Sequence, residues 1–79
     1  MDYEVWEEMT KLIGLKIKKY LDDNGIKYSF VADKINMPMN VFSYLINGKR
    51  KMTAEEYFSI CKVLDVDADF FVKETEELS

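Results

Sequence analysis

The chain has 79 residues, enough for one compact domain but not for two. Its hydrophobic fraction of 48% excludes an intrinsically disordered protein, and its single cysteine excludes an intramolecular disulfide. No stretch approaches the roughly 18 consecutive apolar residues of a membrane helix, so we expect a cytoplasmic protein with no membrane partner.

The formal net charge of −4 is distributed unevenly along the chain. Residues 1–8 and 65–79 together sum to −9, because they hold ten acidic side chains and one lysine. Residues 9–64 sum to +5, with ten basic and five acidic side chains. Net acidity opposes binding to a polyanion, but this asymmetry leaves room for one basic face. We expect a single domain over residues 1–79, with a core at about 10–72 and frayed acidic ends.

A long first helix is predicted from apolar residues that recur every three or four positions, a spacing that forms one helical stripe. The stripe consists of Trp6, Met9, Ile13, Ile17 and either Tyr20 or Leu21. The pattern leaves the start of the helix open between residues 3 and 10. It predicts the end at Asn24-Gly25, because both residues tolerate a positive φ.

A second helix is predicted at 26–36, with one face formed by Val31, Ala32 and Ile35. Pro38 suits the first turn of a helix but not its interior, and it favours extended backbone at Met37. The second and third helices are therefore separated at 36–38.

The third helix is predicted at about 38–46, burying Phe42 and Leu45 and ending at Asn47-Gly48. The turn before it is so short that the helices on either side must cross steeply. Ala32 supplies the small side chain needed at the closest approach, and Asn36 accepts the left-handed backbone of the turn. These features predict a helix-turn-helix.

A fourth helix is predicted from a capping box formed by Thr53 and Glu56, in which each side chain accepts a hydrogen bond from the other residue's amide. Met52 and Tyr57 have the spacing of a hydrophobic staple around this box. The apolar positions continue through Ile60, Cys61 and Leu64.

A last short helix is predicted after Asp67, which serves as its N-cap, with Val66 and Phe71 as the staple pair. No strand pattern or internal repeat is found. The sequence therefore predicts an all-α, compact five-helix domain.

Three stretches of this sequence carry a family resemblance. They are Val31-Ala32-Asp33-Lys34-Ile35-Asn36-Met37, Phe42-Ser43-Tyr44-Leu45 and Asn47-Gly48-Lys49-Arg50. Together they resemble the lambda repressor and Cro family, also called the Xre family, over roughly residues 12–72. The resemblance implies a lambda-repressor-like fold whose third helix enters the major groove of double-stranded DNA. It also implies a transcriptional regulator, most simply a repressor of phage or mobile-element type.

The resemblance assigns site residues position by position. Base edges are implied to face Met39, Asn40, Ser43 and Tyr44 of the third helix. Phosphates are implied to contact Tyr28, Asn47, Lys49 and Arg50, with Lys51 and Lys27 as further candidates. Asn40 can form two hydrogen bonds with adenine, and Met39 can pack on a thymine methyl group. The basic run at 49–51 has a plainer reading as a solvated loop.

The chain also departs from the family pattern at three positions. Pro38 replaces the usual Ser or Thr cap, Asn36 replaces glycine, and Met39 stands where many members carry Gln, Arg or Lys. Base readout is therefore expected to be weak or based on DNA shape.

No metal site and no cofactor are expected, because the chain has no histidine and one cysteine. Cys61 is interpreted as a buried filler, since no histidine can activate it. The acidic residues are interpreted as caps and solvated faces, and no glycine-rich phosphate loop occurs, so no enzyme is expected. The phenylalanines are interpreted as core side chains rather than a base-stacking platform: Phe30, Phe42, Phe58, Phe70 and Phe71.

The expected partner is an operator DNA bound by a homodimer, without a small-molecule ligand. Two apolar groups are candidates for the dimer surface: Phe70, Phe71 and Val72 near the C-terminus, or Val5 and Trp6 near the N-terminus. An alternative is a protein-interaction module, antitoxin-like or antirepressor-like, that binds a basic protein through the acidic ends. Salt-dependent binding to generic duplex DNA distinguishes the two.

Overall fold

A computed structural model describes residues 3–72 of the chain, with the side chains of residues 8–72. Its helices are α1 (Tyr3–Asp23), α2 (Tyr28–Lys34), α3 (Met39–Ile46) and α4 (Ala54–Leu64). Residues 70–72 are helical as well, and no strand occurs within the described range, so the all-α, five-helix prediction is confirmed. Residues 1–2 and 73–79 of the acidic ends lie outside this description, as do the side chains of Val5 and Trp6 that were candidates for the dimer contact.

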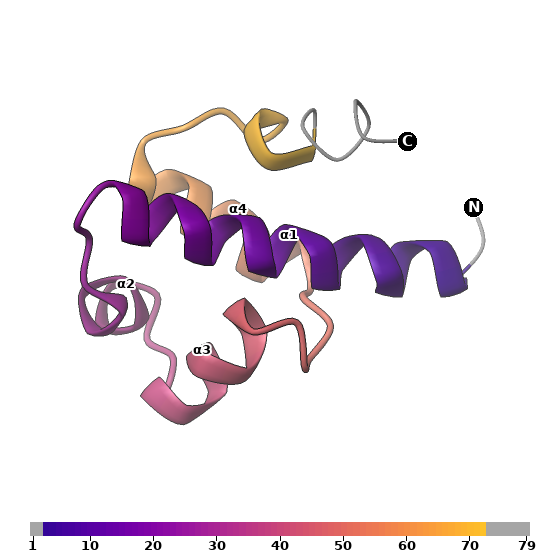
Figure 1. The fold of residues 1–79 in the computed structure, drawn as a ribbon, viewed down its shortest axis with the longest axis horizontal. Helices are drawn as coiled ribbons and strands as arrows, with labels where there is room; N and C mark the ends of the chain where they lie inside the picture. The colour runs from indigo at the N-terminus through magenta and orange to yellow at the C-terminus, as the bar shows by residue number, and fades with distance from the viewer. Residues whose placement is uncertain (1–2, 73–79) are drawn as a thin grey trace.

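The helices are arranged around α1, which runs the length of the molecule (Figure 1). In that view α2 and α3 lie below α1, and the helical segment at 70–72 lies above it. The predicted stripe on α1 is confirmed from Met9 onward, since Met9 is half-buried and Ile13, Ile17 and Leu21 are buried, whereas the side chain of Trp6 lies outside the description. Side chains from all the other elements complete the core, among them Val31, Phe42, Leu45, Ile46, Met52, Ile60 and Phe71. Cys61 is buried among them, as the filler interpretation predicted.

The contact between α1 and α3 requires a glycine. A Cβ added at Gly14 would overlap the backbone carbonyl oxygen of Leu45 and lie 3.3 Å from its carbonyl carbon. Because the obstructing atoms belong to the backbone, no side-chain rotation relieves the overlap. Gly14 therefore sets how closely α3 approaches the core, a role that the helical pattern of the sequence did not reveal.

The four helices α1 to α4 end in the same backbone arrangement. The residue after the helix, or after its cap, has left-handed backbone, and the next amide donates to a carbonyl five residues earlier. The left-handed residues are Gly25, Asn36, Gly48 and Asp65. The first three confirm the predicted helix ends, whereas Asp65 was not foreseen.

The helix-turn-helix corner follows from this arrangement at Asn36, whose φ is 56°. The Met37 amide donates to the Ala32 carbonyl at 2.9 Å, which closes α2, and Pro38 then stands before α3 as its N-cap, with extended backbone. The second helix is shorter than predicted, because the amide of Ile26 closes the end of α1 instead of starting α2.

The interpretation of all five phenylalanines as core is wrong for three of them. Phe30, Phe58 and Phe70 are 50%, 58% and 40% exposed, whereas Phe42 and Phe71 are buried. Adjacent helical residues point about 100° apart, so Phe30 faces outward when Val31 and Ala32 face the core. The burial of Phe71 likewise contradicts its place on an exposed dimer surface.

Candidate nucleic-acid interface

The outward face of α3 gathers the four side chains predicted to face bases. Met39, Asn40 and Tyr44 are exposed and Ser43 is half-buried. Their spacing along one short helix places them on the same side, opposite the buried Phe42. Figure 1 shows α3 at the edge of the molecule, away from the last helical segment. The face is accessible and uncharged, and its contact with bases stays a prediction.

Asn47 belongs to a brace between the end of α3 and α1. Its Nδ2 donates to the Ser43 carbonyl at 2.7 Å, and its Oδ1 accepts from the Lys18 ammonium at 2.7 Å. The amide is thus already used within the protein at the position where a phosphate contact was predicted. The ammonium also stands at the C-terminal end of α3, where the helix dipole favours a cation. Sequence reasoning missed Lys18, since nothing local links residues 29 positions apart.

The side chain of Tyr28, at the start of α2, is tied to the end of α1. Its hydroxyl donates to the Asp22 carboxylate at 2.5 Å. This hydrogen bond, with smaller effects of desolvation and the carboxylate charge, raises the pKa of Tyr28 above its usual value. A phenol has one proton to donate. The hydroxyl is therefore not a donor to phosphate while it holds Asp22.

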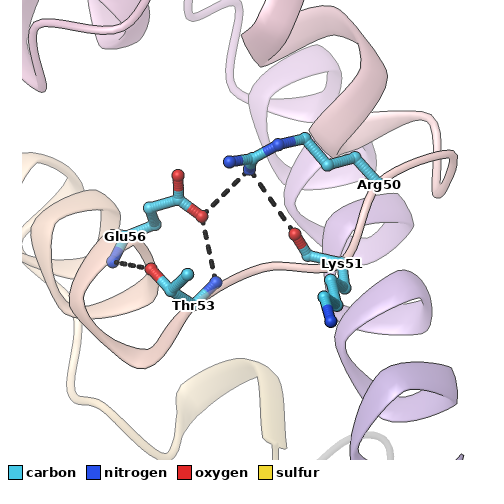
Figure 2. Close-up of polar contacts among 4 residues, drawn as sticks. All are labelled: Arg50, Lys51, Thr53 and Glu56. Carbon is cyan, nitrogen blue, oxygen red and sulfur yellow. Dashed lines mark hydrogen bonds and ion pairs between the residues drawn. The ribbon is translucent and has the colours of Figure 1, made fainter.

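The loop between α3 and α4 carries the basic run. Lys49 and Lys51 are exposed, with Lys27 also exposed before α2. The Arg50 side chain instead turns toward α4, where its Nη1 lies 3.0 Å from the Glu56 carboxylate (Figure 2). The structure thus brings the lysines of the run to the surface and directs the arginine into an internal ion pair.

The predicted capping box at the start of α4 is confirmed. Thr53 Oγ1 accepts from the Glu56 amide at 3.1 Å, and the Glu56 carboxylate accepts from the Thr53 amide at 2.9 Å. Met52 and Tyr57, the predicted staple, are both buried. Partial burial acts to raise the pKa of Glu56, but the hydrogen bond from Arg50 and those of the capping box outweigh it and hold this pKa below its usual value.

Two hollows flank these elements. One of about 430 Å³ lies between the helix-turn-helix corner and the first turns of α4, with Arg50 and Glu56 in its lining. The other, of about 200 Å³, lies between α1, α4 and the last helical segment and is lined by apolar residues such as Met52 and Phe58. Across the described residues no cluster of His, Cys, Asp or Glu is placed to hold a metal ion. No helix in that part is long and apolar enough to cross a membrane.

Comparison with known proteins assigns the chain to a family. Two curated relatives, both called "Uncharacterized HTH-type transcriptional regulator YbaQ", come from Escherichia coli strain K12 and E. coli O6:H1 strain CFT073. Each is 35% identical over 54 residues, covering 68% of this chain and 48% of the relative, so the chain spans about half their length. No solved structure matches it. Residues 16–70 match the Cro/C1-type HTH DNA-binding domain, and the chain therefore belongs to that family, as its helix-turn-helix indicated.

Proposed function

We propose that the chain binds specific sites in double-stranded DNA and acts as a transcriptional regulator, with α3 in the major groove. The observation that carries this is the accessible face of Met39, Asn40, Ser43 and Tyr44, held on the core by buried residues of the same helix. A major groove admits an α-helix, and these side chains offer an amide, two hydroxyls and a thioether to base edges. Membership of a DNA-binding domain family and the names of the relatives support the same function.

Phosphate contacts are proposed for the surface lysines near this face. Lys49 and Lys51 lie on the loop after α3, and Lys27 precedes α2. All three belong to residues 9–64, which sum to +5, and they lie in the segments that directly precede α2 and follow α3. Each phosphate contact releases condensed counterions, and binding should therefore weaken steeply as salt rises.

From its likeness to lambda repressor and Cro, the chain is further proposed to be a repressor of phage or mobile-element type that acts as a homodimer in the cytoplasm. A dimer of such domains reads two half-sites about one helical turn apart. Of the C-terminal candidates for the dimer contact, exposed Phe70 and half-buried Val72 remain after Phe71 is placed in the core. Val5 and Trp6 stay the N-terminal candidates.

Selection of duplex sites from a random library with the purified protein tests the proposal. An enriched motif with two related half-sites would support specific binding by a dimer. Asn40→Ala should then weaken binding to the selected site by about 1 to 3 kcal/mol while leaving random DNA unaffected. Equal loss on selected and random DNA would refute the role of Asn40.

A salt series on a generic duplex separates this function from the protein-interaction alternative. The regulator should bind at low salt, with an affinity that falls steeply as salt rises. An absence of binding even at low salt would refute DNA binding, and it would favour a basic protein as the partner of the acidic ends.

A further inference from the structure

The arginine of the basic run is oriented unlike its neighbours. The Arg50 Nη1 donates to the Glu56 carboxylate at 3.0 Å and, at 3.5 Å, to the backbone carbonyl of Lys51 (Figure 2). The Arg50 and Glu56 side chains are 37% and 20% exposed, so the pair is partly withdrawn from solvent. One guanidinium thus joins the loop to the first turn of α4.

The carboxylate that receives this guanidinium is itself fixed. The Oε1 atom of Glu56 that pairs with Arg50 also accepts the Thr53 amide, and the Glu56 amide donates to Thr53 Oγ1. A carboxylate that accepts hydrogen bonds from both Arg50 and the Thr53 amide has lost part of its rotational freedom. The ion pair therefore attaches the Arg50 guanidinium to a carboxylate that is fixed on the first turn of α4, and the lowered pKa of Glu56 keeps this carboxylate charged.

The loop is attached to the rest of the fold on either side of this pair. The Lys49 amide donates to the Tyr44 carbonyl at 2.9 Å, which joins the start of the loop to α3. Met52 is buried in the core and joins the end of the loop to α4. Between these attachments lie the exposed Lys49 and Lys51, and the Arg50 side chain supplies a cross-link from within.

We propose that Arg50 and Glu56 are positioning residues that pre-organise the loop for phosphate binding, and that Arg50 makes no phosphate contact itself. The inference rests on the proposed DNA binding and assigns a different role to the arginine from the one implied by family resemblance. Binding is stronger when a loop is already held in its bound conformation, because less conformational entropy is lost on association. Lys49 and Lys51 then contact the phosphates of the DNA from a loop that already has its bound conformation.

The alternative, direct contact by Arg50, predicts opposite signs. Under direct contact, Glu56→Gln would release the guanidinium, remove a negative charge and tighten DNA binding. Under positioning, the same change replaces the ion pair by at most a neutral hydrogen bond, which weakens the cross-link and DNA binding although the protein becomes more positive. Glutamine at the third position of a helix still completes a capping box, so this substitution separates the ion pair from the cap.

The experiment measures affinity for a generic duplex over a salt series, using the full chain and four variants whose folding is checked by circular dichroism. Each single variant, Glu56→Gln or Arg50→Gln, should bind about three- to tenfold more weakly than wild type. The double variant should lose no more affinity than either single variant, because the two residues act through one contact and their effects are not additive. Their dependence on salt should equal that of wild type, since the same phosphate contacts form in the complex. Glu55→Gln, an exposed residue on the same turn, is the control for the change of charge and should bind as tightly as wild type or more tightly.

Three results would overturn positioning: unchanged or tighter binding by Glu56→Gln, a salt slope lowered by about 0.9 in Arg50→Gln, or additive losses in the double variant. If Arg50→Gln folds poorly, Arg50→Lys replaces it. Lysine keeps the charge but loses the planar donors, so positioning predicts weaker binding and direct contact predicts little change. If the wild-type protein does not bind DNA at all, the proposed function fails together with this inference. If the wild-type protein binds DNA and one of these three results is found, only this inference fails.

Discussion

Adding one methyl group at Gly14 tests how closely α1 and α3 must approach. The added Cβ would overlap the Leu45 carbonyl oxygen and lie 3.6 Å from the Ile46 Cα, so α3 has to move away from α1. Overpacking of this kind costs typically about 1 to 3 kcal/mol, and a backbone obstacle places the cost in the upper part of that range. Replacing a helical glycine by alanine returns about 1 kcal/mol through helix propensity. The free energy of unfolding should therefore fall by about 1 to 2 kcal/mol in Gly14→Ala.

Thermal unfolding followed by circular dichroism measures this change. For a domain of this size a loss of 1 kcal/mol lowers the Tm by roughly 4 to 8 °C, so we expect a decrease of about 5 to 15 °C. Gly25→Ala is the matched comparison, because its added Cβ meets no atom within 4 Å and only the positive φ opposes it. A Gly14→Ala protein as stable as wild type, or more stable, would refute the close approach. Gly14→Ala should also bind DNA more weakly than wild type, because the substitution displaces α3.

Further predictions concern charge and backbone at the helix ends. Asp22→Ala should tighten binding to generic DNA about two- to fivefold at low salt, because it removes a negative charge and frees the Tyr28 hydroxyl. Tyr28→Phe should bind as tightly as wild type. Weaker binding by Asp22→Ala would contradict this reasoning. Asp65→Gly and Asp65→Asn should raise the free energy of unfolding by about 0.5 to 1 kcal/mol, because both residues tolerate left-handed backbone and neither places a negative charge at the end of α4. Asp65→Ala removes the charge but keeps the backbone strain, so a gain as large as that of glycine would assign the effect to charge alone. The hydrogen bonds from Arg50 and Thr53 lower the pKa of Glu56, so its contribution to stability is complete above the ordinary glutamate pKa and is lost as the pH falls through the lowered value. Glu56→Gln should lack that part of the acid transition, and identical pH profiles of unfolding for the two proteins would disprove it.

Local chemistry in the sequence was sufficient for the helices and for the corner between α2 and α3. The left-handed residues Gly25, Asn36 and Gly48, and the capping box of Thr53 and Glu56, were identified correctly. Each depends on hydrogen bonds that span only three to five residues, so sequence spacing alone specifies them. Asp65 was missed because aspartate adopts left-handed backbone less often than glycine or asparagine.

Only the tertiary structure decided which side chains meet across elements. The exposure of Phe30 and the burial of Phe71 depend on how each helix is rotated against its neighbours, which periodicity in a short helix leaves open. The close contact of Gly14 with α3, the Lys18–Asn47 brace and the Arg50–Glu56 pair likewise require the relative placement of separate elements. Sequence determined where α1, α2 and α3 end, because the hydrogen bonds that close those helices are local. The packing of helices determined which of the basic side chains turn inward, because the carboxylate or amide that receives each one lies on another element.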